Sequence, residues 1–123
     1  MKRILFNRRF VNKTGDDLIP GKIHTIRANF EYWKRFEGQE VALAYWLGKP
    51  YRSKQRVFCV KKIVSVEEII KKSDGSNPFC RFPVQTLAKN DGFANYYELE
   101  DWFRGYPNRI KAIIHFTEFR YAK

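Results

Sequence analysis

The chain has 123 residues, of which 44% are hydrophobic and 17% are aromatic, and this composition excludes a disordered protein. The length fits a single domain, residues 1–123, that buries about two thirds of its unfolded surface. The 24 Lys and Arg residues outnumber the 13 Asp and Glu residues, which gives a net charge of +11. Such a charge favours a polyanionic partner, and the alternative is a basic surface spread evenly without a partner.

No stretch of the sequence is long and apolar enough to cross a bilayer. The longest apolar run, residues 41–47, is far shorter than a membrane-spanning helix. The start of the chain reaches Asn7 after only three apolar residues, so we expect no signal peptide. The sequence therefore predicts a cytoplasmic protein with no membrane partner.

Strand-like patterns begin early and recur along the chain between polar turns. Residues 29–36 form an aromatic rim segment between two of them, and residues 71–83 read as a loop and the best candidate for local mobility. The strand-like runs are residues 4–6, 23–27, 39–45, 56–60, 63–70 and 110–116 with 117–121. These runs give five or six strands, and the run at 63–70 has some helix character near its two glutamates.

Two short helices are predicted in the second half of the chain. The first helix is expected to start at Pro83 and Val84 and to end at about Asn90, because proline suits the first helical turn. Asn95 with Glu98 has the spacing of a helix N-cap and precedes a helix over residues 96–104. This order of elements predicts an α+β fold, a small closed or nearly closed β-barrel with the helices over its ends.

One stretch concentrates polar side chains beside a turn. Pro20 and Gly21 are turn residues, and the β-branched residues 23–26 favour a strand directly after them. The side chains that this turn and strand carry make it the best candidate for the wall of a site, and a solvated surface strand is the alternative. The polar side chains of this turn and strand are Lys22, His24, Thr25 and Arg27.

The same stretch resembles a motif of the ASCH domains, which are relatives of the PUA-like RNA-binding barrels. In that family a Gly-x-Lys-x-x-Thr-x-Arg pattern follows an N-terminal strand and turn. Here Lys22, Thr25 and Arg27 keep the spacing, and Gly21 stands directly before the lysine without the spacer.

Two later stretches extend the resemblance over about residues 15–117. Trp33 followed by residues 36–41 is similar to the family's entry into the next strand. Residues 87–93, leading into residues 98–103, are similar to a helix, turn and second helix of phage-type and bacterial members. The resemblance implies a PUA-like mixed barrel.

The resemblance also implies a reaction. ASCH-like proteins include small amidohydrolases that remove the acyl group from acylated cytidine, using a lysine and a threonine of the motif and a downstream carboxylate. These residues correspond to Lys22, Thr25 and Asp91, where Asp91 replaces the usual glutamate and stands next to Gly92. Thr25 would attack the amide carbonyl, Lys22 would be its base, and Asp91 would handle the proton of the leaving amine.

The charge pattern instead favours a nucleic-acid-binding domain, most of all one for RNA. Basic and aromatic residues are interleaved in residues 8–10, 32–36 and 51–56, and flat rings beside cations suit bases and phosphates. A free nucleoside does not require a strongly basic protein, whereas a polyanion binds one more tightly because counterions are released. An interaction protein with an unknown partner is the third alternative. The expected RNA contacts are Lys22, His24, Arg27, Trp33, Lys34, Arg35, Arg52 and Lys54.

Metal and cofactor sites are not expected. His24 and His115 are the only histidines, and neither has an acidic residue or cysteine at ligand spacing. Cys59 and Cys80 are isolated thiols that fit neither a disulfide framework nor a zinc site, and we expect Cys59 to be a small core residue. A glycine-rich phosphate loop is also missing from the sequence.

Overall fold

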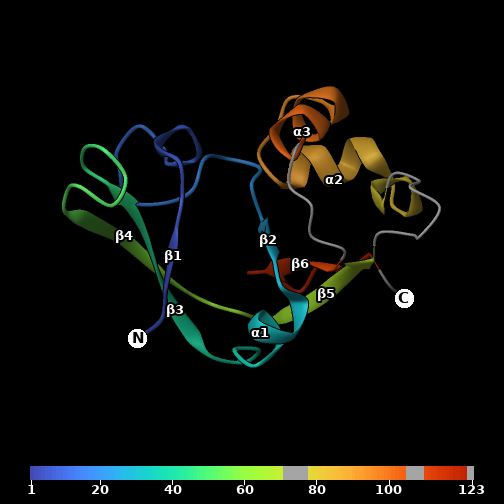
Figure 1. Ribbon diagram of the computed structural model, residues 1–123, viewed down its shortest axis with the longest axis horizontal. Helices are drawn as coiled ribbons and strands as arrows, with labels where there is room; N and C mark the ends of the chain where they lie inside the picture. The colour runs from blue at the N-terminus through green and yellow to red at the C-terminus, as the bar shows by residue number, and fades with distance from the viewer. Residues whose placement is uncertain (71–77, 105–109, 122–123) are drawn as a thin grey trace.

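The computed structural model describes residues 1–70, 78–104 and 110–121, and in these residues six strands form two three-stranded sheets (Figure 1). The alternating patterns of the sequence correspond to these strands. Their bounds are β1 Arg3–Leu5, β2 His24–Ala28, β3 Glu40–Trp46, β4 Gln55–Lys62, β5 Ser65–Ile70 and β6 Ile110–His115.

The first sheet has the order β1-β3-β4. Strand β1 runs parallel to β3, and β3 forms an antiparallel hairpin with β4. The register of the hairpin shifts between Leu43 and Ala44, which marks a β-bulge.

The second sheet has the order β2-β6-β5 and is antiparallel throughout. Strand β4 continues through Ile63 and Val64 into β5, so one stretch of chain joins the two sheets. The backbone N–H of Val64 donates to the carbonyl of His115 over 2.9 Å, which ties this joint to β6. The described strands therefore form two linked sheets and do not close into one barrel.

In the described part of the chain, three α-helices lie at the ends of the sheets: α1 Phe30–Lys34, α2 Val84–Asn90 and α3 Tyr96–Trp102. Helix α1 lies by β5 and β6, and α2 and α3 pack on each other at the other end of β2 (Figure 1). The predicted cap is confirmed, because the Asn95 side chain accepts a hydrogen bond from the N–H of Glu98 over 3.0 Å. Short 3-10 turns are η1 Arg8–Phe10 and η2 Pro78–Arg81.

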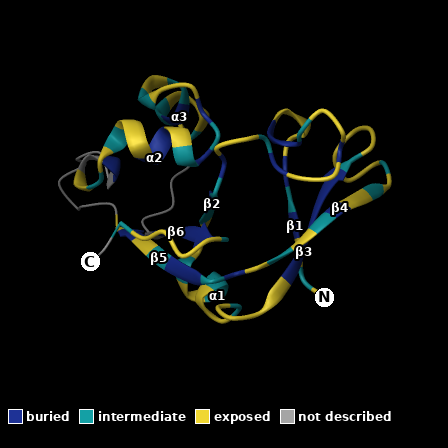
Figure 2. Ribbon diagram, turned by 180° about the vertical axis from the view of Figure 1, so that it is seen from behind, coloured by how far each residue is buried: buried dark blue, intermediate teal, exposed yellow. Residues whose placement is uncertain are grey.

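The core is continuous across both sheets. Buried residues concentrate on β3 and β6, whereas exposed residues follow the outer strand β4 and the loops (Figure 2). The largest fully buried apolar side chains come from all parts of the chain and include Ile4, Leu43, Ile63, Leu87, Leu99 and Ile113. Cys59 is a half-buried free thiol at the edge of this core, and burial raises its pKa to about 11.

The structure confirms the α+β class and corrects several details. The rim segment 29–36 contains a helix, because Asn29 adopts a positive φ of 70° and its side chain caps the N–H of Tyr32. Residues 117–121 are not a strand, and the run at 63–70 has no helix. Most of the predicted loop at 71–83 lies outside the described residues. In the part of the chain that the structure describes, no helix is long and apolar enough to span a membrane.

Candidate active site

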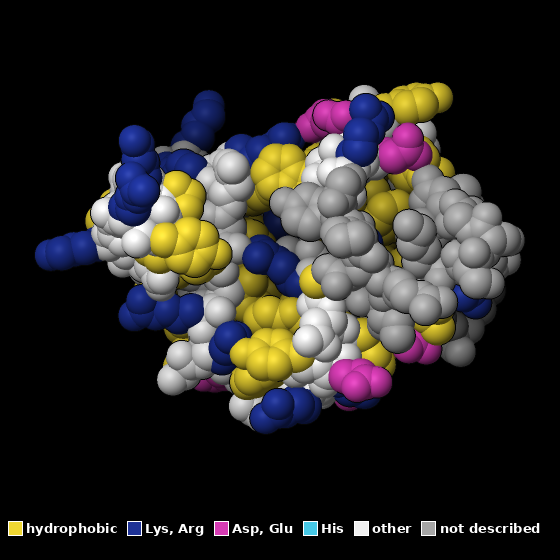
Figure 3. Space-filling model, in the orientation of Figure 1, with side chains coloured by type: hydrophobic (Ala, Val, Ile, Leu, Met, Phe, Trp, Pro, Cys, Tyr) yellow, Lys and Arg dark blue, Asp and Glu magenta, His cyan; other side chains and the backbone are white. Residues whose placement is uncertain are grey.

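A pocket of about 240 Å³ opens between the two sheets. Figure 3 shows it as a hollow near the middle of this face, with yellow apolar side chains along its walls and dark-blue Lys or Arg side chains inside it. Its walls come from the end of β1 and η1, from β2 and β6, from the turn after α2, and from α3. The lining residues are Leu5, Phe6, Asn7, Phe10, Lys22, Thr25, Ile26, Arg27, Ala28, Asp91, Phe93, Trp102, Phe103 and Lys111.

Lys22 and Thr25 both line this pocket although a regular strand would point them to opposite faces. The reason is that Lys22 precedes the strand. Gly21 has a φ of 90°, and the N–H of Lys22 closes a turn onto the carbonyl of Ile19 over 3.2 Å. Strand β2 begins only at His24, so the turn reorients Lys22 onto the same side as Thr25.

Lys22 forms a buried ion pair with Asp91. Its Nζ donates to the Asp91 backbone carbonyl over 2.5 Å and to Oδ1 over 3.2 Å. The two side chains are 2% and 4% exposed. Burial lowers the pKa of Lys22 from its usual value, and the charge of Asp91 opposes this shift only in part. A lysine with a lowered pKa has a larger fraction of free amine near neutral pH.

The second wall of the pocket is built by the end of helix α2. Asp91 is the C-cap of this helix, and the carbonyl of Asn90 accepts a hydrogen bond from the N–H of Ile23 over 2.9 Å, which ties the helix end to the start of β2. Gly92 follows with a φ of 92°. A Cβ at Gly92 would lie 3.1 Å from Lys22 Cδ and 3.1 Å from a ring carbon of Phe10, so glycine permits this close approach.

Thr25 is buried and contacts a cation. Its Oγ1 accepts a hydrogen bond from Arg27 Nε over 3.2 Å, and the hydroxyl keeps its own hydrogen to donate. The guanidinium carbon of Arg27 lies 4.8 Å from the centre of the Phe6 ring. The Thr25 oxygen is therefore placed beside a positive charge in a pocket that also holds the Lys22 amine.

Aromatic side chains form most of the remaining wall, and of these the sequence identified only Phe10, in the basic and aromatic cluster at residues 8–10. The rings of Phe10, Phe93 and Trp102 contact one another edge to face or tilted, with centroids 5.4–5.8 Å apart. Arg9 lies over these three rings with its guanidinium carbon 5.0–5.6 Å from their centres and pairs with Glu98.

His24 lies behind the pocket and is fully buried. Its Nδ1 is 3.2 Å from Asp91 Oδ1, and its Nε2 is 2.7 Å from the Tyr121 hydroxyl. The hydroxyl also accepts from Asn90 Nδ2 over 3.1 Å. Burial raises the pKa of Tyr121 to about 12. No local pattern in the sequence indicated Tyr121, which was expected only to end a strand.

The remaining residues expected to contact RNA lie in separate places. Lys34 belongs to α1 and Arg35 follows it, beyond the end of the pocket at Ala28, and Lys34 pairs with Glu37. Trp33 is also in α1; it is half-buried against the core, and Lys2 lies over its ring at 5.5 Å.

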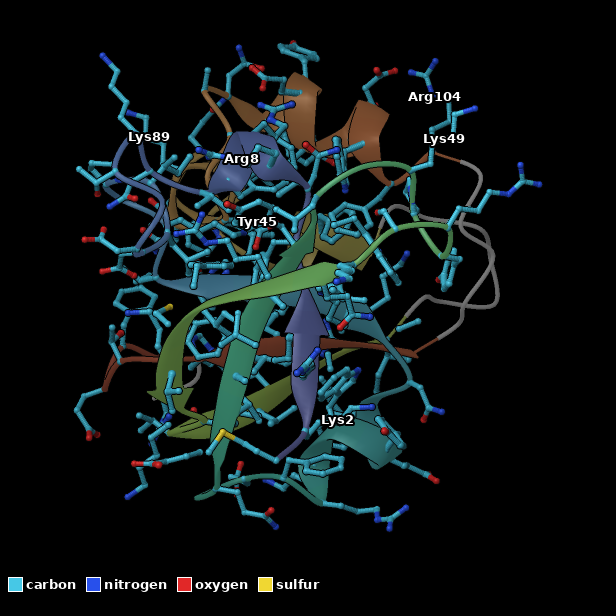
Figure 4. All side chains as sticks on the ribbon, turned by 90° about the vertical axis from the view of Figure 1, so that its left-hand side faces the viewer. Lys2, Arg8, Tyr45, Lys49, Lys89 and Arg104 are labelled. Carbon is cyan, nitrogen blue, oxygen red and sulfur yellow. The ribbon has the colours of Figure 1, made fainter. Side chains whose placement is uncertain are left out.

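Arg52 and Lys54 are exposed on the connection between β3 and β4, at the opposite end of β3 from α1. In Figure 4 this separation appears as the distance between Lys49, near the top, and Lys2, near the bottom. Of the expected RNA contacts, the structure thus brings only Lys22 and Arg27 together in the pocket, and His24 is closed off from solvent.

Among the described residues, no group of three or more His, Cys, Asp or Glu side chains is placed to hold a metal ion. Comparison of the chain with family models, with curated proteins and with solved structures gives no significant match.

Proposed function

We propose that the pocket hydrolyses an amide bond of a small acylated nucleoside or nucleotide. The observation that carries this proposal is the Lys22–Asp91 pair, whose buried amine has a lowered pKa and shares a pocket with the Thr25 hydroxyl. Strongly shifted lysines in clefts are typical of sites that use the amine as a base. A lysine that only held phosphate would instead be exposed and fully protonated.

The first half of the reaction forms an ester on Thr25. The free amine of Lys22 takes the hydroxyl proton as Thr25 Oγ1 attacks the amide carbonyl, and the guanidinium of Arg27 stabilises the negative charge that develops nearby. The carbon–nitrogen bond then breaks. The leaving nitrogen takes its proton from the ammonium of Lys22 through the Asp91 carboxylate, so the lysine returns to its free amine.

The second half releases the acyl group. Water attacks the ester carbonyl, Lys22 again accepts one proton, and the proton returns to Thr25 Oγ1 as the ester bond breaks. The net reaction consumes one water and yields a carboxylic acid and the free amine. Each step uses only residues that line the pocket.

The residue types in the walls of the pocket favour a flat substrate. The rings of Phe10, Phe93 and Trp102 suit a planar base, and Arg27 suits an oxygen-rich group. The resemblance to the ASCH domains points to a cytidine that carries an acyl group on its exocyclic nitrogen. That substrate has the required features, which are a flat ring and a single amide.

The direct test is incubation with N-acetylated cytidine while the release of cytidine and acetate is followed. We expect turnover by the unchanged protein and a loss of at least about a hundredfold in Lys22→Ala and Thr25→Ala. Lys34→Ala is the matched control, because this lysine forms an exposed pair with Glu37 outside the pocket. Absence of turnover, or equal rates in all four proteins, would contradict the proposal.

RNA binding is a second candidate function, and the distribution of charge supports it. Residues 1–62 hold 15 of the 24 Lys and Arg residues but only 5 of the 13 Asp and Glu residues. Basic side chains spread over the left side of the face in Figure 3, beside the mouth of the pocket. The expected contacts outside the pocket, among them Trp33, Arg52 and Lys54, belong to this proposal.

Affinity for a short RNA should fall steeply with salt if this second function holds, with a log–log slope of several units. The double variant Arg52→Ala/Lys54→Ala should reduce that slope by about two. A flat response to salt, or no binding at low salt, would remove RNA binding and leave the hydrolase proposal standing.

We also infer that the fold is a PUA-like domain of the ASCH type. The support is the order of the three motifs and the strand that passes from one sheet into the other at Ile63 and Val64. A cytoplasmic location belongs to the same proposal. Hydrogen bonds between β1 and β2 detected by NMR in solution would join the two sheets into a barrel and support the PUA-like architecture, and sheets that stay separate would contradict it.

A further inference from the structure

We propose that His24 and Tyr121 are positioning residues: Tyr121 fixes His24 as the Nδ1–H tautomer, and His24 holds the Asp91 carboxylate against Lys22. Neither residue lines the pocket, and the proposed reaction does not use either of them directly. The kinetic part of this inference rests on the proposed hydrolase function, whereas the tautomer and the Lys22 titration do not.

The direction of each hydrogen bond follows from the groups in the chain. The Asn90 Nδ2 group is only a donor, so the Tyr121 oxygen accepts from it. The Asp91 carboxylate only accepts, so a neutral His24 donates to it from Nδ1, and Nε2 is then left to accept the hydroxyl hydrogen of Tyr121 over 2.7 Å. An imidazole nitrogen that accepts a hydrogen bond is unprotonated, so the proton of a neutral His24 lies on Nδ1 and points at Asp91 Oδ1.

His115 is arranged in the opposite way. Its Nε2 lies 2.6 Å from Glu67 Oε1, and its Nδ1 is buried without a hydrogen-bond partner among the described residues. A carboxylate only accepts, so His115 carries its proton on Nε2. The His24 and His115 rings are 5.4 Å apart, and burial together with the neighbouring ring of His24 lowers the pKa of His115 to about 4. Where both rings are neutral, the two histidines therefore carry their protons on opposite ring nitrogens.

The consequence for Lys22 follows from its geometry. A free amine has two hydrogens and one lone pair. The two acceptors of Asp91, its backbone carbonyl and Oδ1, take both hydrogens. The lone pair then occupies the remaining tetrahedral direction, away from Asp91. The position of Oδ1 therefore sets the direction of the base, and the Nδ1–H group of His24 fixes Oδ1 from the other side.

Tyr121→Phe is a precise variant for this network, because it deletes only the hydroxyl. The backbone N–H of residue 121, which donates to Glu67 Oε1 over 2.8 Å, remains in place. The arrangement around His115 should therefore persist, while His24 Nε2 loses its donor. Tyr97→Phe is the matched control, since Tyr97 is 77% exposed.

The test is nitrogen-15 NMR of the histidine rings at neutral pH, together with a titration of Lys22 followed by its side-chain signals. We expect a protonated Nδ1 at His24 and a protonated Nε2 at His115 in the unchanged protein. In Tyr121→Phe the His24 signals should move, the His115 signals should stay, and the pKa of Lys22 should fall because Asp91 loses part of its hold on the ammonium. Tyr97→Phe should leave all of these unchanged.

A His24 protonated on Nε2 or on both nitrogens would overturn the inference, and so would a Lys22 titration that is the same in Tyr121→Phe as in the unchanged protein. In the kinetic arm, Tyr121→Phe should lower kcat about tenfold or more and leave KM nearly unchanged. His24→Asn, whose amide still donates to Asp91, should keep more of kcat than His24→Leu. If the unchanged protein shows the expected tautomers but no turnover, the hydrolase proposal fails and the positioning of Asp91 stands.

Discussion

Replacing Lys22 with methionine should strongly destabilise the protein, whereas the same change at Lys34 should not. Both lysines pair with a carboxylate over similar distances, 3.2 Å to Asp91 and 2.9 Å to Glu37. Their surroundings differ: the side chains of the first pair are 2% and 4% exposed and those of the second are 49% and 32% exposed. Because the two distances are similar, a difference in the free energy of unfolding between the two variants reports the effect of burial.

The magnitude follows from this difference in burial. At 3.2 Å and an effective dielectric constant of about 20, two unit charges attract by about 5 kcal/mol, and removal of one partner leaves the other charge buried. We expect Lys22→Met to lower the free energy of unfolding by about 3–5 kcal/mol. An exposed pair contributes about 0–1 kcal/mol, which is the expected loss in Lys34→Met.

Urea unfolding measures both changes as shifts of the midpoint at constant slope. Thermal unfolding should show the Lys22→Met loss as a decrease in Tm of about 10–20 °C. The double variant Lys22→Met/Asp91→Leu should recover much of that stability, because it removes both charges. Equal losses in Lys22→Met and Lys34→Met would refute the buried ion pair.

Three further results are expected. Burial lowers the pKa of His115 from 6.5 to about 4, so the unfolded chain binds more protons than the folded chain between these pH values. The contribution of His115 to the free energy of unfolding should therefore be fully present above pH 6.5 and decrease by about 3 kcal/mol as the pH drops towards 4. Urea unfolding of His115→Gln should lack this pH dependence. Gly92→Ala should lower the free energy of unfolding by about 1–3 kcal/mol, because the φ of Gly92 is positive and the new methyl group meets Lys22 and Phe10. The same variant should slow turnover in the acetylcytidine assay. Unchanged stability would argue against the described turn. Trp33→Ala should weaken RNA binding by about 1–3 kcal/mol. Its loss of stability should be smaller than that of a core deletion, about 3–5 kcal/mol. Severe unfolding with unchanged affinity would instead make Trp33 a core residue.

The elements that were predicted well are those with local signals. The strand-like run at residues 39–45 is a property of a few neighbouring residues, and it corresponds directly to β3. The Asn95 cap is equally local. The helix after Asn29 was missed because three aromatic residues dominate its sequence and aromatic residues are weak helix formers.

The site was predictable only in part, because only some of its residues give a local signal in the sequence. The motif placed Lys22 and Thr25, but their convergence depends on a turn whose geometry the sequence leaves open. The other partners reach the site through the folding of distant segments. Tyr121 is the clearest case, because its hydroxyl meets His24 across 97 positions of sequence and no local pattern distinguishes it from any other tyrosine.

The long sequence separations within the site have a consequence for how the protein is made. When the chain emerges from the ribosome, Lys22 is synthesised 69 residues before Asp91 and remains a hydrated ammonium with an ordinary pKa until that residue arrives. Both sheets and the end of α2 must assemble before the amine is dehydrated. Because contacts of such high sequence separation form late, the lowered pKa of Lys22 should appear only at the last stage of folding, and partly synthesised chains should lack it.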